Sequence, residues 1–221
     1  MALPEIADLF DISHTLLSAL FLRHQYPWDI LAPLGDEIRS LARTLNSDYE
    51  QRGDGIFIHK TAKIHPSANI TGPCIIDEGA ELRPGAFIRG NAVIGKGAVV
   101  GNSCEVKNAV LFDSVQVPHF NYVGDSILGY HAHMGAGAVT SNVKGDKSLV
   151  VIRYAEQHWA TDRKKVGAFL GDFAEIGCNS VLNPGTVIGR NTRVYPLSSV
   201  RGVVPENCVY KNAQEIILIR K

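Results

Sequence analysis

The chain has 221 residues, of which 45% are hydrophobic, and its 22 basic and 22 acidic side chains balance. This length suits one domain with an appended piece, and the charge balance shows no general basic excess of the kind that nucleic-acid-binding domains carry. No apolar run approaches the ~20 residues needed to cross a bilayer, and no signal peptide is expected. The four cysteines are isolated, without a CxxC pair, which favours a reducing compartment such as the cytoplasm.

Residues 1–50 are predicted to form a helical N-terminal segment. A first helix is expected over 4–25, where apolar residues recur four apart at Ile12, Leu16 and Leu20. The Tyr26-Pro27 pair ends it, because proline disfavours helix in the residue before it. A second helix is expected over 35–46, followed by a linker at 51–57. The apolar faces of this pair predict packing against the rest of the chain or a neighbouring subunit, and a docking surface for another protein is the alternative.

From residue 58 onward an apolar residue recurs at every sixth position, with a small residue four positions after most of them. The first run is Ile58, Ile64, Ile70, Ile76, Leu82, Ile88, Ile94, Val100, Val106 and Phe112, and the second is Leu170, Ile176, Leu182, Ile188, Val194 and Val200. Neither helical spacing nor strand alternation produces this period, which is typical of a parallel β-helix. We therefore expect an all-β solenoid over 58–210 of about six coils, each made of three hexads.

Two interruptions of the repeat are expected to matter for function. Near 118–128 the period slips, and the next inward residues are expected to be Val123, Leu128 and Met134. Residues 141–166 contain no hexads, and this inserted loop is predicted to form a hairpin or an arm reaching over an adjacent subunit. The tail at 211–221 is expected to be a short strand or helix.

Arg89 and Lys107 lie eighteen residues apart, each one position after an inward aliphatic residue. If three hexads make one coil, the two cations stack on adjacent coils and repel each other. Glu105 and solvent could relieve this repulsion, which would leave a solvated charged ladder. The alternative is a site for an anion such as a phosphate.

Three histidines stand at or near the slip. His119 follows Pro118 and precedes Tyr122, and a histidine whose ordinary pKa is about 6.5 suits a general base. His131 and His133 form an HxH pair that could bind zinc if alternate residues share a strand face. A metal site needs a third ligand, for which only His119 is a candidate.

The segment GNSCEVKNAVLFDSVQVPHFNYVGDSILGYHAHMGAGAVTSN resembles the acetyltransferase domain of the bifunctional UDP-N-acetylglucosamine pyrophosphorylase/glucosamine-1-phosphate N-acetyltransferase family. With its flanking hexads the resemblance covers roughly 58–210. It implies a left-handed parallel β-helix, a homotrimer with sites between subunits, and acetyl-CoA as the acyl donor. It also implies roles for individual residues: His119 as the base, Arg89 and Lys107 on the sugar and its phosphate, Tyr122 on the amino sugar phosphate, Ala136 at the acyl-CoA site and Asn142 nearby.

Departures from the family pattern fall on the coenzyme and sugar contacts. His133 stands where the family has a sugar-contacting asparagine, Cys178 where it has a coenzyme-site serine, and Pro196 where it has an alanine. A sugar-contacting lysine falls at Ser148, with Lys147 one place away, and a coenzyme-contacting arginine falls near Ala213, with Lys211 close by. The base and phosphate elements match better. Either the acceptor differs, or catalysis has been lost and binding kept.

These observations predict transfer of an acetyl group from acetyl-CoA to the amine of a sugar phosphate or nucleotide sugar. The first 57 residues contain no glycine-rich nucleotide loop of the GxGTRM type, so no pyrophosphorylase activity is expected. The expected partners are a small sugar phosphate and two further copies of the chain, with no nucleic acid and no membrane. One alternative is a non-catalytic module that binds a sugar phosphate and docks a partner through the N-terminal helices. A second is a metal-dependent hydratase that uses His119, His131 and His133.

Overall fold

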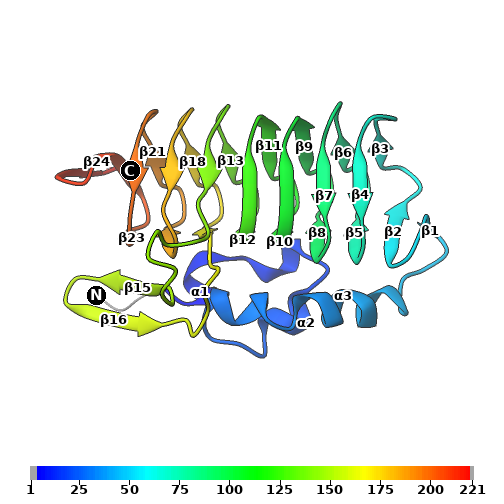
Figure 1. Cartoon of the computed structure of the whole chain (residues 1–221), viewed down its shortest axis with the longest axis horizontal. Helices are drawn as coiled ribbons and strands as arrows, with labels where there is room; N and C mark the ends of the chain where they lie inside the picture. The colour runs from blue at the N-terminus through cyan, green and yellow to red at the C-terminus, as the bar shows by residue number, and fades with distance from the viewer. Residues whose placement is uncertain (1–3, 220–221) are drawn as a thin grey trace.

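The computed structural model describes residues 4–219 as a parallel β-solenoid of about nine turns, with the N-terminal segment lying along its length (Figure 1). The predicted solenoid is confirmed, but six coils was too few. The residues after Phe112, where the hexads fade, still complete coils: Leu111 pairs with Leu128, and Gln116 pairs with His133. No helix within residues 4–219 combines the length and the apolar character needed to cross a membrane.

Each coil passes through three walls in the order first, second, third. The first wall contains β2 (Ile56–His59), β5 (Cys74–Ile76), β8 (Ala92–Ile94), the second halves of β10 (Glu105–Leu111) and β12 (Tyr122–Leu128), β17 (Ala168–Leu170), β20 (Thr186–Ile188) and β23 (Val203–Val204). The second contains β3 (Lys63–Ile64), β6 (Glu81–Leu82), β9 (Val99–Asn102), β11 (Gln116–His119), β13 (His133–Met134), β18 (Glu175–Ile176), β21 (Arg193–Val194) and β24 (Cys208–Asn212). The third contains β4 (Asn69–Thr71), β7 (Phe87–Arg89), the first halves of β10 and β12, β14 (Val139–Thr140), β19 (Val181–Leu182) and β22 (Ser199–Val200).

The hexad residues stack inside the prism as expected, since Ile76 pairs with Ile94 one coil on. The predicted slip near 118–128 is confirmed, with Val123, Leu128 and Met134 facing inward, but a first slip lies one coil earlier. Leu111, not Phe112, pairs with Ile94, so the turn of the chain that follows Val106 is one residue short. The next coil repeats the shortening, because Val106 pairs with Val123 and Leu111 with Leu128.

The predicted helix over 4–25 is broken into short pieces. These are α1 (Ile6–Leu9), the 3₁₀ turn η1 (Ile12–His14) and α2 (Ser18–Phe21), followed by the 3₁₀ turn η2 (Pro27–Leu31) and α3 (Leu34–Ala42). Between α1 and η1 the Asp11 carboxylate accepts a hydrogen bond from the Ser13 N–H. Polar side chains that bond their own backbone compete with helix in this way. The second predicted helix is confirmed as α3, which ends four residues earlier than expected.

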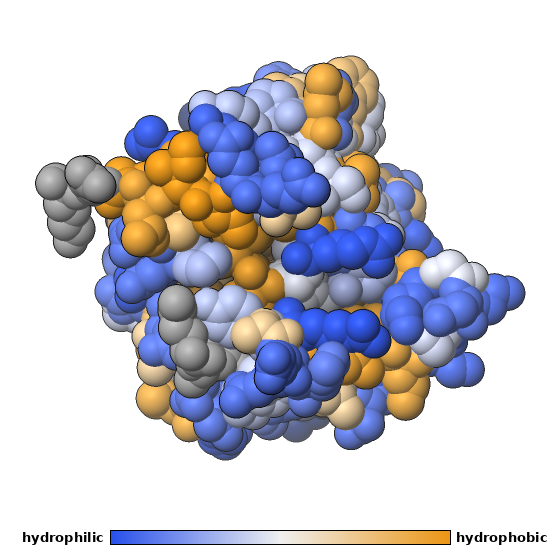
Figure 2. All heavy atoms as spheres, turned by 90° about the vertical axis from the view of Figure 1, so that its left-hand side faces the viewer, coloured by the Kyte–Doolittle hydropathy of each residue, from blue (hydrophilic) through white to orange (hydrophobic). Residues whose placement is uncertain are grey.

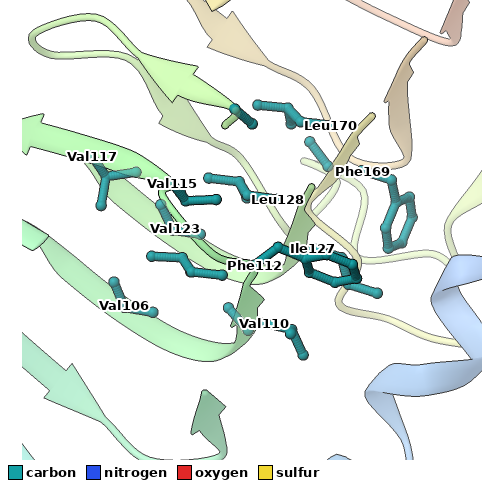
Figure 3. Close-up of a cluster of buried hydrophobic side chains, with 14 of the residues drawn as sticks. Val106, Val110, Phe112, Val115, Val117, Val123, Ile127, Leu128, Phe169 and Leu170 are labelled. Atoms are coloured by element: carbon teal, nitrogen blue, oxygen red, sulfur yellow. The ribbon is translucent and has the colours of Figure 1, made fainter. Parts of the chain in front are cut away.

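The N-terminal segment covers the outside of the first wall. Outward-facing residues there are apolar and buried, and they immediately precede the inward ones: Ile75, Val93, Val110, Ile127, Phe169 and Val187. Phe112 also faces outward, and its ring lies 5.3 Å from that of Phe10 and 5.2 Å from that of Phe21. Figure 3 shows Phe112 and Phe169 on the side of the strands toward this segment. The packing expectation is confirmed within the chain, and the apolar face is not free to dock a partner.

Within residues 4–219, three antiparallel hairpins project from the solenoid. Part of the predicted linker forms the first, in which β1 (Tyr49–Gln51) pairs with β2. The insertion contains the predicted hairpin, β15 (Val151–Tyr154) with β16 (Gln157–Ala160). The tail forms a strand, β25 (Glu215–Leu218), which pairs with β24 and exposes Ile216, Ile217, Leu218 and Ile219. Figure 2 faces this end of the molecule and shows apolar surface among hydrophilic atoms.

Candidate functional site

A buried carboxylate gathers several polar residues at the corner where the third wall turns into the first. Asp125 is 2% exposed and sits at the shortened turn in β12, with a φ of 50°. Its carboxylate accepts hydrogen bonds from the Asn108 amide at 2.8 Å and the Asn142 amide at 2.5 Å, and lies 3.4 Å from the Lys107 ammonium. Buried charges need such partners, because an unpaired carboxylate in the interior is costly. Asp125 therefore fixes the positions of Lys107 and Asn142.

The register places the two predicted cations side by side, because Val106 pairs with Ile88 and each cation follows directly. Each has its own carboxylate. The Arg89 guanidinium donates to Glu105 at 2.6 Å, and this bond raises the pKa of Arg89, whereas Lys107 pairs with Asp125. Glu105 thus relieves only one of the two cations. The repulsion expected from stacking is offset by two separate ion pairs.

Tyr122 also belongs to this group and lies on β12, where it pairs with Glu105 of the preceding coil. Its hydroxyl accepts a hydrogen bond from the Asn142 amide at 3.2 Å. Its ring lies over Gly124, where a Cβ would come within 2.4 Å of the hydroxyl oxygen, so only glycine fits beneath it. Burial, followed by the charge of Asp125, raises the pKa of Tyr122. The phenol is therefore neutral at physiological pH and can exchange hydrogen bonds with a ligand.

His119 lies at the other end of the third wall, at the corner where the second wall ends. It is the last residue of β11, its side chain is exposed, and the next residue, Phe120, turns the corner with a φ of 52°. Asn121, which is 3% exposed, fixes this corner: its side-chain oxygen accepts from the His119 N–H, and its amide donates to the carbonyls of Gly135 and Ala138. Among residues 4–219, none forms a hydrogen bond to the His119 ring, which leaves the imidazole available to a ligand.

Four of the predicted residues form one column along that corner. The carbonyl of His119 accepts from the Gly137 N–H, that of Ala136 from the Asn179 N–H, and that of Cys178 from the Leu197 N–H. His119, Ala136, Cys178 and Pro196 therefore occupy equivalent places on successive coils. A groove of about 470 Å³ runs beside this column on the second wall and is lined by His133, Cys178 and Pro196 together with Glu175 and Tyr195.

His133 does not join the sugar-side group as the resemblance implied. It lies on the second wall, where its ring is 2.8 Å from the Glu175 carboxylate. His131 does not share its face, because it turns a corner with a φ of 56° and stacks on Phe173. Within the described residues, no three His, Cys, Asp or Glu side chains are placed to hold a metal ion. The expectation that His131 and His133 present a common face was wrong.

Sequence reasoning missed Asn108, Asn121 and Asp125, which position the predicted residues. The signal for two of them was present: Asn108 in EVKNA and Asp125 in YVGDS are seventeen apart and occupy the same shortened turn on successive coils. It also missed a hollow of about 510 Å³ at that turn, where Lys107, Asn108 and Asp125 face Arg163, Lys164 and Lys165 of the insertion.

The sequence is similar to a protein-family model and to several known proteins. The protein-family model for the GMPPB C-terminal domain matches residues 70–153. The bifunctional protein GlmU of Methanococcus maripaludis is 33% identical over 215 residues, covering 89% of this chain and 48% of that protein. A bifunctional sugar-1-phosphate nucleotidylyltransferase/acetyltransferase of Sulfurisphaera tokodaii is 32% identical over 159 residues, covering 64% of this chain and 40% of that protein. The chain spans about half or less of the length of these relatives.

Similar solved structures are more distant. A mutant perosamine N-acetyltransferase from Caulobacter crescentus, solved with CoA and GDP-perosamine, aligns over 75% of this chain and 57% of that chain at 16% identity, with a TM-score of 0.35. The polysialic-acid-specific acetyltransferase NeuO aligns over 76% of this chain and 88% of that chain at 10% identity, with a TM-score of 0.43. Likenesses at this level carry no argument about function.

Proposed function

Because this chain is a hexapeptide-repeat β-helix protein related to the GlmU proteins at about 30% identity, we propose that it transfers an acetyl group from acetyl-CoA to the amine of a sugar phosphate or nucleotide sugar. One observation carries the proposal. The exposed imidazole of His119 belongs to the column that continues through Ala136, Cys178 and Pro196, at the corner where the third wall that holds Arg89 and Tyr122 begins. A base between a coenzyme groove and an acceptor surface suits acyl transfer.

In this mechanism His119 accepts a proton from the acceptor amine. The amine nitrogen then bonds to the acyl carbon of the thioester, the carbon–sulfur bond breaks, and the departing thiolate takes the proton back from the imidazole. The developing oxyanion needs a backbone donor. The N–H groups of Gly135, Gly137 and Ala138 are already bonded within the solenoid. The N–H of Ala136 is therefore the donor that we assign to the oxyanion.

The acceptor phosphate is assigned to the third wall. Arg89 and Lys107 present neighbouring cations, and the Asn142 amide joins the Tyr122 hydroxyl to the Asp125 carboxylate that pairs with Lys107. Such fixed donors orient a bound acceptor without further ordering of side chains. We place the coenzyme in the groove on the second wall, and we infer a homotrimer in which an adjacent subunit completes each site.

The test is release of free thiol from acetyl-CoA with glucosamine 1-phosphate and a panel of amino sugar phosphates and nucleotide-linked amino sugars. Loss of a general base costs about 10²–10⁴ in rate, so His119→Ala should fall by at least about a hundredfold. His65→Ala is the matched control, because His65 is an exposed histidine of the first coil whose ring bonds to the side chain and N–H of Ser67. Unchanged turnover in His119→Ala, or no thiol release with any acceptor, would refute the proposal.

A non-catalytic sugar-phosphate-binding module is the second candidate, favoured by Cys178 and Pro196 in the proposed coenzyme column. Both are exposed and differ from the residues that the resemblance implied. The same panel separates the two functions. A rise in melting temperature with a sugar phosphate, unaccompanied by thiol release, identifies the binding module.

A further inference from the structure

The hollow at the corner between the third and first walls gathers cationic side chains from two parts of the chain, the wall and the insertion. Lys107, Arg163, Lys164 and Lys165 line it against two carboxylates, Asp125 and Asp162, a net charge of +2. Its volume of about 510 Å³ lies in the range of small-molecule sites. Leu31 and Ala32 of the N-terminal segment close its far side.

The three cations on the insertion have no carboxylate partner in the described part of the chain. Among residues 4–219, Arg163, Lys164 and Lys165 form no ion pair with a carboxylate, whereas Arg89 and Lys107 are each paired. The Nε of Arg163 is moreover buried and donates to no group in the described part of the chain. A guanidinium and two ammonium groups on consecutive residues form an anion-binding surface.

This basic stretch is held in place by its backbone. The Arg163 carbonyl accepts from the Val150 N–H at 2.8 Å, Val166 N–H donates to the Asn142 carbonyl at 3.0 Å, and Gly167 N–H donates to the Asp125 carbonyl at 2.8 Å. Val150 and Val166 are fully buried. Residues 163–165 are thus fastened to the coil that carries Asp125 and Asn142. A site whose backbone is already ordered loses less entropy when a ligand binds.

We propose that this hollow binds the second phosphoryl group of a diphosphate, so that the acceptor is a nucleoside-diphosphate-linked amino sugar rather than an amino sugar monophosphate. The inference rests on the proposed function. One phosphoryl group lies against Lys107 on the wall, and the other lies against Arg163, Lys164 and Lys165 on the insertion. The insertion then sets acceptor specificity.

Calorimetric titration of the full chain with inorganic pyrophosphate and inorganic phosphate, at about 50 mM salt to limit screening, tests the site without requiring turnover. We expect pyrophosphate to bind at least about tenfold more tightly than phosphate. Lys164→Gln/Lys165→Gln should weaken pyrophosphate binding about tenfold. Lys60→Gln/Lys63→Gln, which removes two exposed lysines outside the hollow, should bind like the native chain.

The kinetic counterpart is an increased KM for a nucleotide-linked amino sugar in Lys164→Gln/Lys165→Gln, with kcat and the KM for glucosamine 1-phosphate unchanged. The proposal is overturned if pyrophosphate binds no more tightly than phosphate, or equally well to the double variant. Absence of thiol release with every acceptor, alongside lysine-dependent pyrophosphate binding, overturns the acyltransferase function and leaves the diphosphate site standing.

Discussion

Replacing Asp125 by asparagine should destabilise the chain strongly, although the side chain keeps its size. The carboxylate accepts from two amides and pairs with Lys107, and its side chain is 3% exposed whereas that of Lys107 is 25% exposed. In Asp125→Asn one amide can still donate to the remaining oxygen, but the other meets an NH₂ group. Losing one charge-assisted hydrogen bond costs about 1.5–3 kcal/mol, and the partly exposed ion pair adds about 0.5–1 kcal/mol.

The free energy of unfolding should therefore fall by about 3 kcal/mol, which for a chain of 221 residues corresponds to a melting temperature lower by about 6–12 °C. Urea titration and calorimetry at neutral pH measure both quantities, with the exposed Asp54→Asn as the control. A double-mutant cycle with Lys107→Met should show a coupling of about 1 kcal/mol. A loss below about 0.5 kcal/mol in Asp125→Asn would refute the idea that this carboxylate organises the corner.

Two further predictions concern the packing and the titration of the wall beneath the N-terminal segment. Phe112→Ala removes a ring that packs against Phe10 and Phe21, and should lower the free energy of unfolding in urea by about 3–5 kcal/mol. The control Leu22→Ala, at a residue 75% exposed, should change it by no more than about 0.5 kcal/mol. Equal losses in the two variants would contradict the packing. Burial is the largest effect on the Asp113 carboxyl and raises its pKa. The folded chain therefore binds a proton at Asp113 more readily than the unfolded chain does. The protonated carboxyl adds to the free energy of unfolding at low pH, and this stabilisation is lost as the pH rises through the folded pKa. The unfolding free energy of the native chain should therefore increase relative to that of Asp113→Asn as the pH falls from about 6 to about 4. The opposite trend would show that the buried carboxyl prefers its charged form.

The solenoid was predictable because its period is set by one geometrical requirement, an inward aliphatic residue on each wall of each coil. That requirement is independent of the rest of the chain, so Ile76 and Ile94 reveal it locally. The shortened turn was less visible, because Leu111 and Phe112 are both apolar and only pairing shows which one faces inward. The covered wall leaves its own signal in apolar doublets such as Val93-Ile94, which a strand buried on both faces requires.

The site was predictable only in part. His119, Arg89, Lys107 and Tyr122 carry groups whose chemistry suggests binding or catalysis, but the residues that position them, Asn121 and Asp125, look like ordinary corner residues until the coils are stacked. The charges of 163–165 were equally hidden, because nothing local says that the insertion folds back onto the turn beside Asn142. The broken N-terminal helix has the same origin, since its course follows the wall against which it packs.

The long contact between the N-terminal segment and the first wall has a consequence for the order in which a newly made chain can fold. Residues near the start, Leu9 and Asp11, bond to Asp172, and Trp28 packs near Phe169. Each coil can pack against the preceding coil as soon as it leaves the ribosome, because it contacts only its neighbours. The apolar side chains around Leu9 and Trp28, however, stay uncovered until translation reaches Phe169 and Asp172, since Asp11 precedes Asp172 by 161 residues.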